Sequence, residues 1–160
     1  MTETYERFIG WLDGGEAAYR LIDHAPEGRT ELVSELRGNK LAAAAKCLVI
    51  MVKLGKRTTR YVLAVVPGDA KVDIAAVREL LGGTYASFAS ADKAEALAGS
   101  ASGTTILPVS FHPDLELVVD PGLIDHPEIF FNAARLDRSV ALTTADYVRL
   151  ATPRLAPIAA

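Results

Sequence analysis

Two apolar, β-branched segments joined by a short polar loop constrain the fold of this chain most strongly. The segments are Cys47–Leu54 and Arg60–Val66, and the loop between them reads Gly55-Lys56-Arg57-Thr58-Thr59. Strand-forming runs on either side of a five-residue loop that contains glycine are typical of a β-hairpin. The sequence therefore predicts a hairpin whose loop carries much of the positive charge.

Helical and strand patterns are intermixed on both sides of this hairpin. Helical spacing or capping residues predict helices at Tyr5–Leu12, Thr30–Gly38, Asp73–Gly82, Ser90–Gly99 and from Thr144 onward. Apolar runs bounded by turn residues predict strands at Ala17–Asp23, Thr84–Ala89, Leu115–Asp120, Glu128–Ala133 and Ser139–Thr143. There is no regular β-α-β alternation, so we expect an α+β fold with a mixed β-sheet surrounded by helices.

Two finer expectations concern the helix from Thr30 and the end of the chain. Thr30 is the expected N-cap of its helix, and Leu32, Val33 and Leu36 are its expected buried stripe. The last residues, 152–160, contain two prolines and are expected to fray.

Length and composition favour one compact domain over residues 1–160. The chain has 160 residues, of which 50% are hydrophobic and 23% charged. Its longest apolar run, Cys47–Val52, is far too short to cross a bilayer, and the N-terminus lacks the apolar core of a signal peptide. We therefore expect a cytoplasmic protein whose single cysteine, Cys47, is a buried thiol without a disulfide.

Positive charge is concentrated in one segment of an otherwise acidic chain. The segment from Arg37 to Arg60 has no acidic residue and seven basic ones: Arg37, Lys40, Lys46, Lys53, Lys56, Arg57 and Arg60. The whole chain has a net charge of −3, so this +7 segment leaves −10 on the remainder. Such a patch favours a polyanionic partner approached from one side, whereas a duplex-DNA binder is usually basic overall. The alternative is a solvated, lysine-rich hairpin tip.

Standard catalytic signatures are missing from the sequence. It has no glycine-rich phosphate loop followed by lysine, no G-x-S-x-G elbow and no H-E-x-x-H motif. His24, His112 and His126 are far apart, and with a single cysteine they lack the spacing of a zinc site. We expect neither a metal nor a cofactor. A metal hydrolase that uses His24, His112 and distant acidic residues stays an alternative.

Lys46 is the most unusual residue, because it stands between four alanines and an apolar run. Either its stem lies on apolar surface while the ammonium reaches water, or a pocket holds the ammonium to bind an anionic or electron-rich substrate group. A second feature is the segment 103–113, which contains Gly103, Pro108 and Pro113 and has few charges. This segment either presents backbone groups to a ligand or is an ordinary connection.

Four separated segments then occur in one order along the chain: Val33–Gly38, Ala45–Val49, Pro108–Pro113, and Leu136–Val140 followed by Thr144–Tyr147. Together they resemble the YbaK and prolyl-tRNA synthetase-associated domain family, most closely its YeaK branch. The similarity runs from about His24 to Tyr147. Members of this family hydrolyse wrongly charged aminoacyl-tRNAs.

The resemblance implies a compact α+β domain with a mixed, partly barrel-like sheet, and a site between Lys46 and a loop that ends at Pro108. Lys46 would contact the terminal adenosine or its ester, and backbone groups ahead of Pro108 would hold the aminoacyl carbonyl while water attacks. Two positions depart from the family pattern. Thr104 replaces the glycine expected four residues before Pro108, with Gly103 one position off, and Ala134 replaces a glycine.

The function implied is a trans-editing hydrolase that deacylates tRNA charged with a small amino acid such as serine, threonine or alanine. Its expected substrate-binding residues are Gly103, Thr104, Pro108, Ser110, Ser139 and His24, and its expected tRNA-binding residues are Lys53, Lys56, Arg57 and Arg60. Ser139 would read the amino-acid side chain, or is simply a strand hydroxyl after a turn. The expected partner is the acceptor end of aminoacyl-tRNA, with a synthetase as a further candidate and neither membrane nor DNA. The alternative is a non-catalytic tRNA- or nucleotide-binding module of the same fold.

Overall fold

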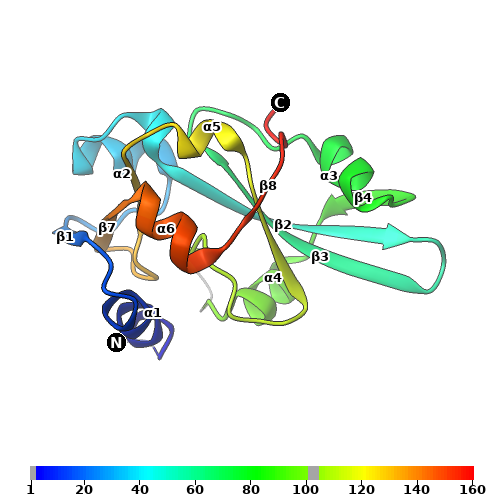
Figure 1. Ribbon diagram of the computed structural model, residues 1–160, viewed down its shortest axis with the longest axis horizontal. Coiled ribbons are helices and arrows are strands. Elements are labelled where there is room, and N and C mark those ends of the chain that lie inside the picture. The colour runs from blue at the N-terminus through cyan, green and yellow to red at the C-terminus, as the bar shows by residue number, and fades with distance from the viewer. Residues whose placement is uncertain (1–2, 101–104) are drawn as a thin grey trace.

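The computed structural model describes residues 3–100 and 105–160 (Figure 1). Within these ranges the α-helices are α1 (Glu3–Gly14), α2 (Thr30–Arg37), α3 (Ile74–Leu81), α4 (Ala91–Ala98), α5 (Pro121–Ile124) and α6 (Thr144–Ala151), with a 3-10 turn η1 (Leu41–Ala43). The strands are β1 (Tyr19–Asp23), β2 (Ala45–Leu54), β3 (Thr58–Pro67), β4 (Tyr85–Phe88), β5 (Leu115–Val119), β6 (Glu128–Asn132), β7 (Arg138–Thr143) and β8 (Arg154–Leu155). None of the helices in this part of the chain is long and apolar enough to span a membrane.

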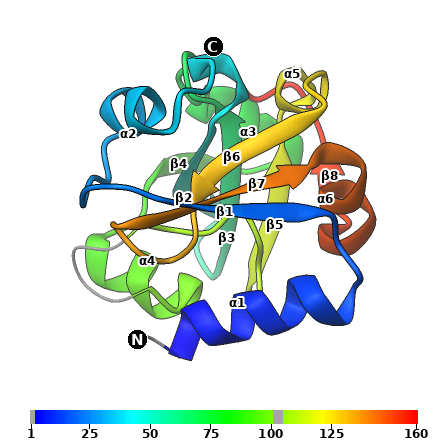
Figure 2. The same cartoon turned by 90° about the vertical axis from the view of Figure 1, so that its left-hand side faces the viewer.

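The described strands form two sheets, one with the order β4-β2-β3-β5-β8 and one with the order β1-β7-β6. The β3–β5 and β5–β8 ladders are parallel and the others are antiparallel. Figure 2 shows the three-stranded sheet crossing in front of β3 and β5. The predicted α+β fold with mixed strand directions is therefore confirmed, and the two sheets are not closed into a barrel.

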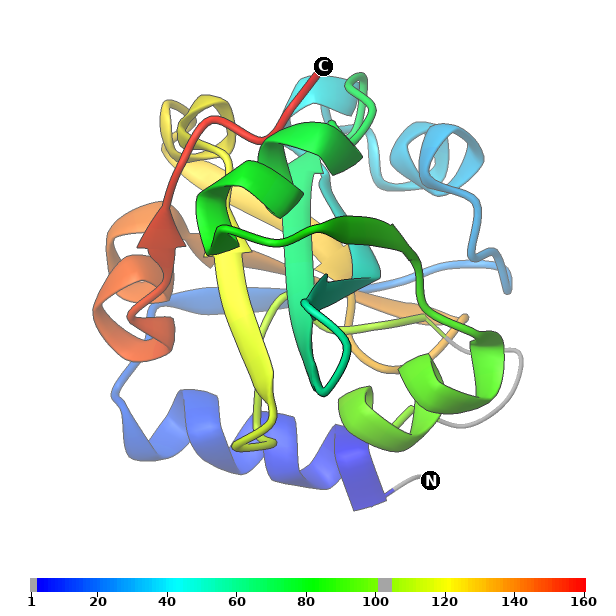
Figure 3. The same ribbon diagram turned by 90° about the vertical axis from the view of Figure 1, so that its right-hand side faces the viewer.

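The predicted β-hairpin is confirmed as β2 and β3, which pair from Ala45↔Pro67 to Leu54↔Thr58. Its loop has three residues, 55–57, rather than the predicted five, because Thr58 and Thr59 pair within β3. One face of the hairpin packs into the core between the two sheets through Val49 and Leu63. The other face, with Ile50 and Val62, packs against α3 and the end of the chain. Figure 3 shows α3 lying across this outer face. Burial on both faces explains why the runs Cys47–Val52 and Tyr61–Val66 within these strands are continuously apolar rather than alternating.

The predicted helix starts hold for α3 and α4, because the Asp73 carboxylate accepts from the Ala76 N–H and the Ser90 hydroxyl accepts from the Lys93 N–H. For α2 the predicted cap is wrong, because Thr30 is the first helical residue rather than the N-cap.

In the predicted buried stripe of α2, Val33 is confirmed as buried, but Leu32 is 38% and Leu36 is 50% exposed, and the polar Ser34 is buried instead. The Ser34 hydroxyl accepts hydrogen bonds from Arg37 and Asn39. The helix therefore turns a polar face inward, which apolar spacing alone does not reveal.

The end of the chain is packed, which corrects the expectation that residues 152–160 fray. Its strand β8 pairs with β5, and Ile158 is only 1% exposed. The buried Asp120 carboxylate accepts hydrogen bonds from the backbone N–H groups of Ile158 and Ala159, at 2.9 and 3.0 Å. A carboxylate far away in sequence thus fixes a segment that its two prolines alone would leave unpaired.

Candidate functional site

A cavity of about 310 Å³ opens beside the start of β2. Its described walls come from β2 (residues 45–48), from α2 (Thr30, Val33 and Arg37), from β6 (Phe131 and Asn132) and from loops at Gly28 and Thr105-Ile106. Segments far apart in sequence therefore meet around one hollow. This size lies at the lower end of ordinary small-ligand pockets.

Lys46 lines this cavity and is half-buried. Its Nζ donates a hydrogen bond to the carbonyl of Ala70 at 2.7 Å, so the turn after β3 holds the ammonium. Within that turn, a Cβ added to Gly68 would lie 2.5 Å from the backbone oxygen of Leu41. Only glycine permits this approach, and it brings the turn close enough to fix the position of the Lys46 side chain.

The segment ahead of Pro108 forms another wall of the same cavity, through Thr105 and Ile106. Pro108 itself is buried behind this wall, and its carbonyl accepts a 2.6 Å hydrogen bond from the hydroxyl of the fully buried Tyr147. Pro108 thus supports the wall rather than lining it. Gly103 and Thr104 lie outside the described residues.

Arg37 is the second cationic side chain in the lining. Its Nε donates to Asn39 Oδ1 at 2.8 Å, its Nη1 to Ser139 Oγ at 3.1 Å and to Asn132 Oδ1 at 3.5 Å, and its Nη2 to Ser34 Oγ at 3.3 Å. All four acceptors are neutral. Burial lowers the pKa of Arg37 to about 10, so the guanidinium still carries its charge at neutral pH.

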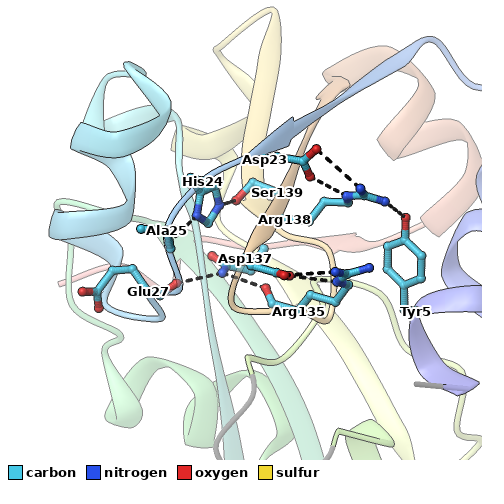
Figure 4. Close-up of polar contacts among 10 residues, drawn as sticks. Tyr5, Asp23, His24, Ala25, Glu27, Arg135, Asp137, Arg138 and Ser139 are labelled. Atoms are coloured by element: carbon cyan, nitrogen blue, oxygen red, sulfur yellow. Dashed lines mark hydrogen bonds and ion pairs between the residues drawn. The ribbon is translucent and has the colours of Figure 1, made fainter. Parts of the chain in front are cut away.

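Ser139 and His24 form a hydrogen-bonded pair (Figure 4), and Ser139 is also the acceptor for Arg37 Nη1. The His24 Nδ1 must donate to the Ala25 carbonyl, 2.8 Å away, because a carbonyl only accepts. In the neutral imidazole Nε2 then accepts from the Ser139 hydroxyl at 2.7 Å. Ser139 is fully buried, and neither residue lines the cavity. Ser139 is connected to the cavity through its hydrogen bond with Arg37. Direct contact of Ser139 with the amino-acid side chain of the substrate stays a prediction.

Asn132 ties the cavity wall to two neighbouring loops. Its Nδ2 donates to the carbonyls of Glu27 and Arg135, both at 2.9 Å. Two residues further on, Ala134 has a left-handed backbone with φ of 60°. This conformation favours glycine, which is the residue that the family pattern leads one to expect at this position. The strained turn keeps its shape with alanine in place.

Cys47 lines the cavity but is poorly suited to be a nucleophile. Burial raises the pKa of its thiol well above the usual range, so the reactive thiolate is not populated at neutral pH. Cys47 is a free cysteine, as predicted, but it is partly rather than fully buried. No described residue in the lining is acidic, and its two charged groups are both cations.

Ser110 lies apart from the cavity, with its hydroxyl bound to the Leu115 carbonyl at 2.6 Å. His112 accepts from the Asp114 N–H through Nδ1, whereas His24 is bound to Ser139, so the structure does not join these two histidines in one site. Among the residues that the structure describes, no three His, Cys, Asp or Glu side chains gather where they could hold a metal ion.

The four predicted tRNA-binding residues lie at the opposite end of the β2–β3 hairpin. Lys53, Lys56 and Arg57 are exposed. Arg60 is half-buried and forms a bidentate ion pair with Glu116, at 2.7 and 2.5 Å. From Lys46 to the last residue of β2 the strand runs about 26 Å, at about 3.3 Å per residue. The +7 segment is therefore two separate groups of charge (Figure 1).

Sequence reasoning missed Arg37, Asn132 and Thr105 as parts of the site. Arg37 entered only as one charge of the basic segment. The available signal was its position inside the family-like segment Val33–Gly38, directly before the left-handed Gly38 that ends α2. Asn132 lies two residues before Ala134, one of the two positions that depart from the family pattern.

Comparison with known proteins covers nearly the whole chain. The Multifunctional Ser/Thr-tRNA deacylase ProXp-y of Escherichia coli strain K12 is 43% identical over 153 residues, which are 95% of this chain and 90% of that protein. The protein of the same name from Escherichia coli O157:H7 matches equally well.

Two crystal structures share the fold. A hypothetical protein superimposes with a TM-score of 0.83 at 21% identity, over 99% of this chain and 100% of that one. A protein provisionally described as a trans-editing enzyme for prolyl-tRNA synthetase superimposes with a TM-score of 0.80 at 19% identity, over 100% of this chain and 99% of that one.

The same result comes from comparison with protein families. Residues 24–150 match the aminoacyl-tRNA editing domain, and this range holds Lys46, Pro108 and every residue of the cavity described above. The range also agrees closely with the segment in which the sequence resembles the YbaK-type proteins. The chain belongs to the aminoacyl-tRNA editing domain family.

Proposed function

We propose that this protein is a trans-editing deacylase, which hydrolyses the ester of tRNA mischarged with a small amino acid of the serine, threonine and alanine class. One observation carries the proposal: Lys46 and the segment ahead of Pro108 line a single cavity with cationic walls. The E. coli relative, 43% identical, is a Ser/Thr-tRNA deacylase. A synthetase gains only about 1–3 kcal/mol from one methylene, so small look-alikes need a second sieve.

The chemistry we propose needs no nucleophilic side chain. An aminoacyl ester is already activated, and water attacks its carbonyl once the ester is oriented and the developing charge is stabilised. The Cys47 thiol in the cavity wall is neutral, so it contributes surface to the cavity and does not act as a nucleophile. Lys46, held by the Ala70 carbonyl, contacts the terminal nucleotide or its ester region. Backbone groups of the segment from Gly103 to Pro108 hold the carbonyl.

The tip of the hairpin supplies a second contact with tRNA in this proposal. Lys53, Lys56 and Arg57 bind phosphates of the acceptor stem while the single-stranded end reaches the cavity. Arg60 contributes less, because Glu116 already neutralises it. The partner is the acceptor end of aminoacyl-tRNA, the site of action is the cytoplasm, and a synthetase that releases the wrong product is a further partner.

The test is deacylation of tRNAs charged with serine, threonine, alanine and cysteine by the wild type and by Lys46→Ala. We expect the wild type to deacylate at least one of the first three, and the variant to lose about 100-fold or more in kcat/KM. Lys71→Ala is the matched control, because Lys71 is exposed and adjoins the Ala70 carbonyl that holds Lys46.

Three results bear on the alternatives. Stoichiometric binding of charged tRNA without turnover would establish the non-catalytic binder instead. Full activity after exhaustive chelation would exclude the metal hydrolase. Equal activity of Lys46→Ala and the wild type would show that the ester is cleaved elsewhere.

A further inference from the structure

Arg37 has an environment that a structural arginine rarely has. It is desolvated enough for burial to lower its pKa, yet all its hydrogen-bond acceptors in the described part of the chain are neutral. Arg60 and Arg138, by contrast, each form an ion pair with a carboxylate. A half-buried charge without a counter-charge costs stability, and an anionic ligand would offset that cost.

The hydrogen bonds of Arg37 leave a donor for such a ligand. Its neutral acceptors take one bond from Nε, two from Nη1 and one from Nη2. A guanidinium has five N–H groups, so one N–H on Nη2 remains beyond these four bonds. Arg37 lines the cavity, so a molecule inside the cavity lies next to this side chain.

A second group in the same wall also lacks a partner. The Thr105 Oγ1 is buried and has no hydrogen-bond partner among the described residues. Thr105 lines the cavity together with Arg37. Because this oxygen is buried, it has almost no surface open to the cavity, and its lack of a partner is a cost within the wall. Among its described lining residues the cavity thus has a guanidinium with only neutral acceptors and no acidic side chain, which points to an anionic occupant.

We propose that Arg37 binds an anionic oxygen of the aminoacyl-tRNA end inside the cavity, with Ser139 as the residue that positions its guanidinium. This inference rests on the proposed function, since aminoacyl-tRNA is the substrate. Two groups of that substrate carry such an oxygen. One is the phosphate of the terminal nucleotide, and the other is the ester carbonyl oxygen as it gains charge during water attack.

The neighbours of Arg37 make it a prearranged receptor. Its acceptors come from α2, from the turn after α2, from β6 and from β7, so four segments fix the guanidinium before any ligand arrives. Ser139 donates to His24 and accepts from Arg37, which fixes the direction of its hydroxyl. Binding to such a fixed donor requires little reorganisation. The free α-ammonium of the substrate is repelled from this wall, which orients the ester.

The first experiment measures binding of adenosine 5′-phosphate and of adenosine by calorimetry and by thermal shift. If the phosphate is the ligand, the wild type binds the nucleotide at least about tenfold more tightly than the nucleoside, and Arg37→Gln removes this difference. Arg78→Gln is the matched control, because Arg78 lies on α3 and pairs with Glu79 away from the cavity. This readout does not depend on deacylase activity.

The second experiment measures deacylation of Ser-tRNA by the same variants. If the carbonyl oxygen is the ligand, Arg37→Gln lowers kcat about tenfold or more with KM unchanged, whereas removal of a phosphate-binding group raises KM. Arg37→Lys keeps the positive charge but lacks the planar guanidinium, so it should recover part of the lost activity. This variant also tests the proposal if Arg37→Gln does not fold. Ser139→Ala shows a smaller loss in the same kinetic parameter as Arg37→Gln.

Outcomes separate this inference from the proposed function. Nucleotide binding that depends on Arg37, in a protein without deacylase activity, would support the anion site and reject the proposed function. Deacylation that depends on Lys46 but not on Arg37, with nucleotide and nucleoside bound alike, would overturn the role of Arg37 and leave the proposed function standing. Folded Arg37→Gln and Arg37→Lys with wild-type binding and kinetics would overturn it as well.

Discussion

The two ends of the β2–β3 hairpin carry charge from one continuous basic segment, but they hold it in different ways. At the cavity end, Lys46 and Arg37 are half-buried and fixed by hydrogen bonds to named acceptors. At the tip, Lys53, Lys56 and Arg57 are exposed. A fixed, desolvated charge interacts strongly with a ligand group that is placed directly beside it. An exposed charge attracts its partner over a longer distance, and salt weakens this attraction. A run of basic residues can thus serve two purposes.

The largest effect at the tip is expected from Lys56→Gln combined with Arg57→Gln. The double variant should raise KM for aminoacyl-tRNA several-fold at low salt and leave kcat unchanged. The slope of log affinity against log salt concentration should become less negative by about 0.7–0.9 for each phosphate that the variant no longer neutralises. Measurement of KM at several salt concentrations checks this. An unchanged salt slope would show that the tip does not touch tRNA.

Acid should loosen the cavity end in a defined pH window. Hydrogen bonds from Arg29, followed by the charge of that residue, lower the pKa of Glu27 from 4.5 to about 2. A depressed carboxyl pKa stabilises the fold above about pH 4.5, and this contribution is lost as the pH falls toward 2. The amides of Gly28 and Arg29 donate to the Glu27 carboxylate, so they report its titration directly.

The measurement is an NMR titration of these two amide signals, with Glu27→Gln as the comparison. In the wild type both signals should shift with an apparent pKa of about 2. In the variant this transition should disappear, while the Gly55 amide at the tip behaves alike in both proteins. A midpoint near 4.5 would mean that the Arg29 contact does not form in solution.

The smallest effect is expected from Cys47→Ala at the cavity wall. Because burial raises the pKa of the thiol, kcat/KM should stay within about twofold of the wild type, and alkylating reagents at neutral pH should react slowly. Deacylation and thiol alkylation rates check this. A loss comparable to that of Lys46→Ala would assign the thiol a part in catalysis.

Local pattern predicted much of this fold, and non-local contacts account for what it missed. The hairpin and the caps at Asp73 and Ser90 depend on neighbouring residues, so the sequence alone reveals them. The packing of the chain end depends on Asp120, 38 residues before Ile158. No local rule connects the two.

In the candidate site, too, local sequence pattern predicts some residues, and non-local contacts determine the others. Lys46 was conspicuous because an ammonium interrupts an apolar run. Arg37 was not, because its site is made by Asn132 and Ser139, which lie 95 and 102 residues away. Ser139 looked like a residue that touches substrate, whereas the fold buries it completely and its hydroxyl accepts a hydrogen bond from Arg37. Two of the family-like segments, Val33–Gly38 and Ala45–Val49, contribute residues to the lining of the cavity, and only the fold shows which side chains these are.

The division between the two ends is tested most directly by single-turnover deacylation of Ser-tRNA at saturating enzyme. Under these conditions binding no longer limits the rate, so only groups that act on the ester affect it. Lys46→Ala should be slower than the wild type by about 100-fold or more, and the Lys56→Gln, Arg57→Gln double variant should match the wild type. A wild-type rate for Lys46→Ala, or an equal loss in the double variant, would contradict the assignment of ester cleavage to the cavity end.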